Sequence, residues 1–308
     1  MPASAVPCSA CSRWLTRTRS HITAAGWGLL NPYPPREGST MGHDYTDALL
    51  ARDGAVAMLT LNRPEKLNAF GPKMEEDIRA AIAEVNRDPS IRVLIVTGAG
   101  RAFSAGADVK AWDARIREGG EPSAVDRWRQ NEARHAMVLG LYELSKPVIA
   151  AVNGAAVGMG MDFALAADIR IAAESARFAM LYIKRGLVPD EGGAWFLPRL
   201  VGPARAAELI FTGDFVDGRE AERIGLVNRC VPDDQLLPAA RELADKIAAG
   251  PPIAMEFAKR AIREGLGLSL RAHFDAIGYY MSVLNNTEDV AEGMRAFVER
   301  RAPVFSGR

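Results

Sequence analysis

The sequence has few cysteines, no excess of charge of either sign and no long apolar run, and each absence excludes a class of protein. Three cysteines occur among 308 residues, and the single pair Cys8 and Cys11 has no second pair to complete a zinc site. Lysine plus arginine number 38, as do aspartate plus glutamate, so the zero net charge indicates no nucleic-acid partner. No apolar run is long enough to cross a bilayer, and we expect no membrane-spanning helix.

The first forty residues differ in composition from the rest of the chain. They contain four arginines and one acid, Glu37, and are rich in serine, threonine and proline. This composition fits a mitochondrial transit peptide. It also fits a disordered leader that precedes a later start at Met41, and we favour this second interpretation. We therefore predict a disordered or leader segment over residues 1–43. Because unpaired thiols are typical of a reducing cytoplasm, we also predict a cytoplasmic protein.

After this segment, apolar strand patterns alternate with helical ones. The predicted strands are residues 55–61, 92–97, 147–152, 168–172 and 226–231, and the predicted helices between them are residues 72–86, 159–167 and 218–224. The continuous apolar run at 92–97 is typical of a strand that is covered on both faces. The alternation predicts an α/β core with largely parallel strands over residues 44–231. From residue 236 onward only helical patterns occur, which predicts a C-terminal helical region over residues 232–308.

Two loops that contain glycine follow predicted strands and could offer backbone N–H groups to a ligand. Residues 104–108 (SAGAD) are small enough for a ligand to contact the backbone closely. Residues 158–160 (GMG) open a helix whose first N–H groups have no partner within the helix and favour negative charge. Each loop taken alone also fits a tight turn or close helix packing.

Together with several other segments, these loops resemble the enoyl-CoA hydratase/isomerase (crotonase) superfamily. The matches occur in order along the chain at residues 62–69 (NRPEKLNA), 103–110 (FSAGADVK), 146–154 (KPVIAAVNG), 166–170 (AADIR), 186–189 (GLVP), 212–213 (TG) and 292–300 (EGMRAFVER). The resemblance implies an α/β fold, a crotonase-like spiral of ββα units with a C-terminal helical trimerisation region. It also implies a homo-oligomer that is a trimer or a dimer of trimers.

The resemblance further implies an acyl-CoA substrate, with coenzyme A as part of the substrate and no separate cofactor or metal. The N–H groups of Ala107 and Met159 match the family's oxyanion hole, which holds the thioester oxygen while the α-carbon gains enolate character. The residues that match substrate-binding positions are Lys66, Leu67, Ala105, Asp108, Val109, Lys110, Gly158, Tyr182, Phe297 and Arg300. Phe297 and Arg300 would reach the coenzyme A of a neighbouring subunit. For Lys110 and Arg300, a solvated surface cation is the alternative interpretation.

The reaction depends on where the carboxyl groups lie. Family hydratases use two glutamates, and the matching positions here hold Asp162 and Tyr182. Aspartate is shorter by one methylene, and a tyrosine with a reference pKa of about 10 is a poor base. Asp190 matches the position where several family isomerases carry a catalytic aspartate. The leading hypothesis is therefore an enoyl-CoA isomerase that shifts a proton with Asp190, whose pKa the apolar neighbours at 187–188 and 195 would raise.

Other interpretations stay open. A hydratase could add water to a 2-enoyl-CoA with Asp162 and either Asp190 or Glu191. A non-catalytic acyl-CoA-binding protein could have kept the oxyanion hole alone, and a thioester hydrolase or dehalogenase could use Asp190 as a nucleophile. Asp190 or Glu191 could instead stabilise a helix N-terminus after Pro189, and Asp162 could orient Tyr182 or a water.

Overall fold

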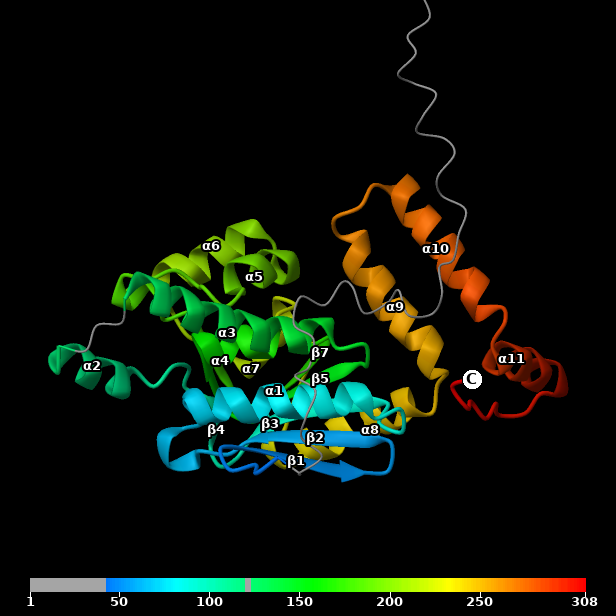
Figure 1. The fold of residues 1–308 in the computed structure, drawn as a ribbon, viewed down its shortest axis with the longest axis horizontal. Helices are drawn as coiled ribbons and strands as arrows, with labels where there is room; N and C mark the ends of the chain where they lie inside the picture. The colour runs from blue at the N-terminus through cyan, green and yellow to red at the C-terminus, as the bar shows by residue number, and fades with distance from the viewer. Residues whose placement is uncertain (1–42, 120–122) are drawn as a thin grey trace, which may run out of the picture. The chain divides into compact units, whose positions relative to one another are not determined.

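Six strands form the main sheet of this computed structural model, which describes residues 43–119 and 123–308 (Figure 1). The strand order is β1 (Ala48–Asp53), β2 (Val56–Leu61), β3 (Val93–Gly98), β5 (Val148–Val152), β7 (Ile169–Ala173) and β10 (Arg229–Val231). β1 and β2 are antiparallel, and every later pair is parallel. The predicted leader, apart from His43, and the pair Cys8 and Cys11 lie outside the described residues.

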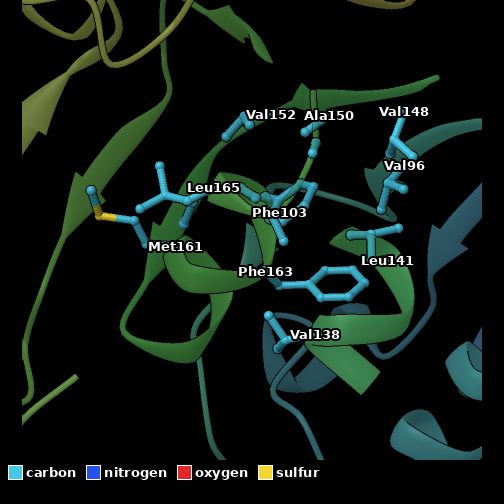
Figure 2. Packing of buried hydrophobic residues seen from close by; sticks show 14 of the residues in the cluster. Val96, Phe103, Val138, Leu141, Val148, Ala150, Val152, Met161, Phe163 and Leu165 are labelled. Carbon is cyan, nitrogen blue, oxygen red and sulfur yellow. The ribbon is translucent and has the colours of Figure 1, made fainter. Parts of the chain in front are cut away.

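Helices cover both faces of the main sheet. One face packs against α8 (Leu236–Ala248), and the other faces α1 (Pro72–Arg87), α3 (Ala124–Glu143) and α4 (Met159–Leu165). Figure 2 shows Val96 of β3 and Val148 of β5 near Leu141 of α3, in the same cluster as Phe163 of α4. All residues of β5 are buried, as are the first five of β3. Their continuous apolar sequences are thus explained by burial on both faces.

A second sheet of very short strands lies beside the first. It contains β4 (Ala102–Ser104), β6 (Ala155–Val157), β8 (Arg177–Ala179) and β9 (Val216–Asp217) in that order. The first three strands are parallel, and β9 pairs antiparallel to β8. Strands of two or three residues are too short to show an alternating pattern, so the sequence did not predict this sheet. The predicted α/β class is confirmed, with two mixed sheets.

One predicted strand is much shorter than expected. Residues 226–231 are apolar enough for a strand, but only Arg229–Val231 pairs with β7. The N–H groups of Leu226 and Val227 instead donate to the carbonyl of Ala221 at 2.8 and 3.2 Å. These bonds belong to the turn that ends α7 (Gly218–Arg223), so the local turn competes successfully with the strand.

The remaining elements are helical. They are α2 (Val109–Arg117), α5 (Gly193–Val201), α6 (Pro203–Thr212), α9 (Pro252–Gly265), α10 (Leu270–Leu284) and α11 (Glu288–Glu299), with 3-10 turns η3 (Pro64–Lys66), η4 (Ile183–Arg185) and η5 (Asp233–Gln235). On α9, Lys259 and Arg263 both form ion pairs with Asp168, at 2.8 and 2.6 Å. These ion pairs join the C-terminal helices to the start of β7. Within residues 43–119 and 123–308, no helix is both long and apolar enough to span a membrane.

Asp77 on α1 holds the segment that leads into β1. Its side chain is fully buried, and its Oδ2 accepts hydrogen bonds from the backbone N–H groups of residues 46–48 at 2.9–3.2 Å. Its Oδ1 contacts His43 at 2.6 Å and Lys73 at 2.8 Å. Burial raises the pKa of Asp77, but the hydrogen bonds from Lys73, His43 and the backbone outweigh burial and lower this pKa to about 2.

We expect Asp77→Asn to lower the free energy of unfolding by about 1.5–3 kcal/mol at neutral pH, since hydrogen bonds to a charged group are lost. A folded-state pKa below the unfolded value gives stability that is present above the unfolded pKa and lost as pH falls through the folded one. The difference between wild type and variant should therefore shrink between about pH 4 and about pH 2. Denaturant unfolding at several pH values measures it, with exposed Asp113→Asn as control. An equal difference at pH 7 and at pH 2 would contradict this role for the charge.

Candidate active site

Three parallel strands of the second sheet end at the candidate site. β4 leads into Ala105, β6 leads into Gly158, and β8 is followed closely by Tyr182. Because these strands are parallel, their carboxyl ends lie at one edge of the sheet, which is a common place for ligand sites in α/β proteins. The strands that the sequence did not predict are therefore the elements that position the predicted site.

Two glycines let the predicted oxyanion loops pack backbone against backbone. Gly106 has φ +86°, and a Cβ there would lie 2.6 Å from the carbonyl oxygen of Val157 and 3.5 Å from the nitrogen of Met159. Gly158 has φ +51° and is the N-cap of α4, whose first residue is Met159. Glycine adopts these positive φ values easily, and at Gly106 its lack of a Cβ avoids the contact with Val157. The structure thus places the loop of Ala107 directly against the loop of Met159.

The N–H groups of Ala107 and Met159 are available to a ligand. Within the part of the chain that the structure describes, neither group donates a hydrogen bond. Met159 begins α4, so its N–H has no acceptor within the helix and lies at the positive end of the helix dipole. A thioester oxygen that gains negative charge would be stabilised by two such donors. The role of this pair as an oxyanion hole remains a prediction.

Residues 66–70 run alongside residues 104–108. The N–H of Ala105 donates to the carbonyl of Leu67 at 2.9 Å, that of Phe70 to Gly106 at 2.8 Å, and that of Asp108 to Phe70 at 3.1 Å. This pairing brings two of the predicted substrate-binding residues, Lys66 and Leu67, to the loop that contains Ala105 and Asp108. Leu67 has φ +52°, a conformation that is uncommon for leucine and is held by these neighbours.

Asp108 is paired with cations in this segment. Its Oδ2 lies 3.1 Å from Lys66 Nζ and 3.4 Å from Arg63. Burial raises the pKa of Asp108, but the N–H of Ala111 and the Lys66 ammonium lower it by more, and the net pKa lies below the usual range. Lys66 remains half-exposed and Lys110 at the start of α2 is exposed, so both ammonium groups are accessible to an anionic ligand.

Two predicted substrate-binding residues lie apart from this cluster. Phe297 is on α11 with 83% of its surface exposed, and Arg300 follows at the C-cap with φ +57°. Figure 1 shows α11 at the opposite side of the view from α2. A single chain therefore does not bring Phe297 and Arg300 to the other site residues. Their predicted contact with a neighbouring subunit's substrate stays a prediction.

Tyr182 joins two buried carboxyl groups. Its hydroxyl lies 2.6 Å from Asp162 Oδ2 and 2.7 Å from Glu191 Oε2. Asp162 is fully buried on α4 and Glu191 is 5% exposed. The other oxygen of Asp162 faces Gly193 and has no hydrogen-bond partner among the described residues. Near the ring, the Cβ position of Gly158 is 3.7 Å from Tyr182 Cε2, so the cluster adjoins the N-terminus of α4.

The three groups of this cluster all have raised pKa values. Burial is the main cause of the raised pKa of Asp162, and the Tyr182 hydroxyl opposes it. Burial also raises the pKa of Glu191, and the adjacent Asp190 carboxyl raises it further. Burial and the two carboxyl groups raise the pKa of Tyr182, which stays a neutral phenol. The cluster is an acid–base set that can hold a carboxyl proton near neutral pH.

Asp190 lies in a different environment from the one predicted. Its side chain is exposed, and its backbone carbonyl contacts His135 Nε2 of α3 at 3.0 Å. The expected desolvation by apolar neighbours is wrong, because Leu187, Val188 and Trp195 are themselves 37%, 71% and 41% exposed. The sequence hypothesis ranked Asp190 ahead of Glu191, whereas the structure buries Glu191 and connects it to Tyr182.

Neither acid caps the following helix. The N-cap of α5 is Gly192 with φ +100°, and no side chain of the described residues forms a cap hydrogen bond there. The helix-capping interpretation of Asp190 and Glu191 is therefore wrong. The alternative for Asp162, that it hydrogen-bonds Tyr182, is confirmed by the 2.6 Å contact. Within residues 43–119 and 123–308, no three His, Cys, Asp or Glu side chains form a group that could hold a metal ion.

A buried acid with a raised pKa makes the fold less stable as it ionises. Below the unfolded-state pKa its contribution is fully present, and it is lost as pH rises through the folded-state pKa. Relative to Glu191→Gln, the wild type should therefore lose unfolding free energy between neutral and alkaline pH, by on the order of 1–3 kcal/mol. Denaturant midpoints at pH 6 to 10 measure this, with exposed Glu242→Gln as control. If the denaturant midpoints of wild type and Glu191→Gln changed with pH in the same way, ionisation of Glu191 would not destabilise the fold.

Comparisons with known proteins identify the family that this chain resembles. The family model described as enoyl-CoA hydratase/isomerase matches residues 51–308. A probable enoyl-CoA hydratase of Mycobacterium bovis is 42% identical over 260 residues, covering 82% of this chain and 89% of that protein. A 1,2-epoxyphenylacetyl-CoA isomerase of Escherichia coli is 38% identical over 253 residues, covering 82% and 95%.

Solved structures give the same result for the fold. A crystal structure of an enoyl-CoA hydratase from Bacillus anthracis superposes with a TM-score of 0.80 at 35% identity, covering 85% of this chain and all of that chain. The expected crotonase fold is thereby confirmed, including the C-terminal helices. With the family model spanning both sheets and these helices, the chain belongs to the enoyl-CoA hydratase/isomerase (crotonase) superfamily of acyl-CoA enzymes.

Proposed function

We propose that this enzyme adds water reversibly to the double bond of a 2-enoyl-CoA, with Asp162 and Glu191 as its acid–base pair. The supporting observation is the bridge by which one tyrosine hydroxyl joins two buried carboxyl groups. Hydration needs both a group that accepts a proton from water and a group that gives one to the α-carbon, whereas a 1,3-proton shift needs one carboxylate. The hydratase names of relatives such as the Mycobacterium bovis protein support the same choice.

In this proposal the backbone holds the thioester while the carboxyl pair moves protons. The N–H groups of Ala107 and Met159 receive the thioester oxygen as it gains charge, and losing one such donor costs about 2.7–4 kcal/mol of barrier in other enzymes. Glu191, protonated in the resting site, gives its proton to the α-carbon. Asp162 finally holds the proton that water loses.

Coenzyme A lies, in the same proposal, along the paired segments 66–70 and 104–108. Lys66 and Lys110 supply exposed cations for its phosphates. Phe297 and Arg300 contact the coenzyme A of a neighbouring subunit in a trimer or a dimer of trimers. Phe297 on α11 and Arg300 at its C-cap are both exposed, so both side chains are available for such a contact.

A second candidate is the isomerase with Asp190 as acid and base. Two observations favour it: Asp190 is exposed, and a 1,2-epoxyphenylacetyl-CoA isomerase is among the relatives. In this arrangement Asp162 and Glu191 would help to position Asp190 and would exchange no proton with the substrate.

The two candidates give different products. Purified enzyme is incubated separately with a 2-enoyl-CoA and a 3-enoyl-CoA, and the products are identified by mass spectrometry and chromatography. Formation of 3-hydroxyacyl-CoA from the 2-enoyl substrate is expected. Conversion of the 3-enoyl to the 2-enoyl compound without any hydroxyacyl product would favour the isomerase. Binding without turnover, and without deuterium exchange at the α-carbon, would indicate an acyl-CoA-binding protein.

A further inference from the structure

The hydrogen bonds around Tyr182 require more protons than the tyrosine carries. The phenol has one proton, yet its oxygen contacts a carboxyl oxygen on each side, at 2.6 and 2.7 Å. Both contacts have the length of a strong O–H···O bond, and each such bond needs its own proton. If both carboxyl groups were ionised, a phenol lone pair would face a carboxylate lone pair within the buried site. One of the two carboxyl groups must therefore be protonated.

The surroundings indicate which carboxyl group holds this proton. Glu191 adjoins the Asp190 carboxyl, whose negative charge opposes ionisation of Glu191. The Asp190 carboxyl also raises the pKa of Asp162, but only through its charge, whereas it raises the pKa of Glu191 through a side-chain hydrogen bond as well. Asp162 accepts the phenol hydrogen bond at 2.6 Å. His135 contacts the backbone carbonyl of Asp190, not either member of the buried pair. The resting order is thus a Glu191 O–H that donates to Tyr182, whose own O–H donates to the Asp162 carboxylate.

We propose that the Tyr182 hydroxyl relays protons between Glu191 and Asp162, so that Asp162 takes part in the reaction without touching the substrate. Asp162 is fully buried, with one oxygen against Gly193 and the other on the phenol. Asp162 therefore has no exposed surface, and its Oδ2 is connected to Glu191 through the Tyr182 hydroxyl. The phenol ring is half-buried, and its Cε2 lies 3.7 Å from the Cβ position of Gly158, the residue before Met159 of the predicted oxyanion hole.

The relay balances protons in the hydration proposed above, on which this step rests. The Glu191 O–H bond breaks and its proton forms the new C–H bond at the α-carbon. The water oxygen bonds to the β-carbon, and the proton that water loses passes to the Tyr182 oxygen as the phenol proton passes to Asp162. Afterwards Asp162 returns a proton to Tyr182, and Tyr182 passes its own to Glu191. The site then regains its resting state without a proton from solvent.

Two variants and one control test the relay. Tyr182→Phe removes the hydroxyl, and Asp162→Asn removes the proton acceptor but keeps an oxygen for the phenol. Tyr142→Phe is the matched control, because Tyr142 is a partly buried tyrosine that packs against Trp195 and makes no hydrogen bond with either carboxyl group. Hydration of crotonyl-CoA is measured for each protein over a range of pH.

With crotonyl-CoA we expect kcat to fall roughly 10²-fold in Tyr182→Phe and in Asp162→Asn, with little change in KM. The double variant should be no slower than either single one, because the relay is broken once. Both variants should also lose the acidic limb of the pH profile, while Tyr142→Phe should retain both limbs. Wild-type kcat in Tyr182→Phe, or losses that multiply in the double variant, would overturn the relay.

A measurement without substrate separates this inference from the proposed function. Infrared spectra of the wild type at neutral pH should contain the carbonyl stretch of a buried protonated carboxyl group, and Glu191→Gln should lack it. Absence of this band from the wild type would refute the shared proton, whatever the reaction. A wild type that shows the band but forms no hydroxyacyl product would retain the proton order and refute the hydratase proposal alone.

Discussion

Glu191→Gln should lower kcat of hydration by roughly 10²–10⁴-fold, the range that positioned acid–base groups contribute. Glutamine keeps the volume of the side chain and can still hydrogen-bond Tyr182, but it has no proton to give to the α-carbon. KM should change little, because Glu191 is 5% exposed and is not expected to bind coenzyme A. Steady-state kinetics with crotonyl-CoA measure the effect, and Glu242→Gln controls for the loss of a carboxyl group elsewhere.

The proposed roles of Glu191 and Asp162 also predict how kcat/KM depends on pH. Hydration needs a protonated Glu191 and an ionised Asp162, so kcat/KM should fall on both the acidic and the alkaline side. Because both carboxyl groups have raised pKa values, both limbs should lie above the range of ordinary carboxyl groups. Asp190→Asn provides the decisive comparison. If Asp190→Asn loses more hydration activity than Glu191→Gln, the group that gives the proton is Asp190 and not Glu191.

Gly106→Ala should lower kcat by roughly 10²–10³-fold, as expected when one oxyanion donor is lost. An added Cβ would lie 2.6 Å from the carbonyl oxygen of Val157, and φ +86° is unfavourable for alanine. To relieve this contact, the Ala107 loop must move away from the Met159 loop, which separates the two N–H groups. Kinetics with crotonyl-CoA and binding of a non-reactive acyl-CoA measure the two consequences separately.

Gly186→Ala is the matched control for this effect. Gly186 also has a positive φ, +70°, but no atom of the described residues lies within 4 Å of its Cβ position. Both variants therefore carry backbone strain, and only Gly106→Ala pushes the oxyanion loops apart. Equal kcat losses in the two variants would show that strain in general, and not the spacing of the two donors, explains the effect.

The site predictions that rest on backbone geometry differ from those that rest on burial. Loop composition and family resemblance were enough to select Ala107 and Met159, because a backbone donor depends on chain geometry that glycine and small residues reveal. The ranking of Asp190 ahead of Glu191 depended on surroundings that come from distant parts of the chain. Asp190 and Glu191 are adjacent in sequence, yet Asp190 is exposed whereas Glu191 is buried, with 5% of its surface exposed.

The main sheet was predictable and the second sheet was not, for a physical reason. Residues 93–96 and 148–152 are continuous apolar runs, since helices cover both faces of the main sheet. β4, β6 and β8 have three residues each, so no periodic pattern could indicate them. These short strands form because they hydrogen-bond to one another, and their carboxyl ends bring three separate loops to one edge of the second sheet.

The sequence alone determined the α/β class, the helical C-terminus, the family and the two loops with free N–H groups, because these depend on local pattern and residue type. Tertiary structure alone decided which carboxyl groups are buried and that Tyr182 lies between Asp162 and Glu191. These three residues are separated by 20 and 9 positions, and the proton that they share depends on distances of 2.6 and 2.7 Å and on burial. Neither quantity is encoded in local pattern, since both depend on how α4 packs beside the turns at Tyr182 and Glu191.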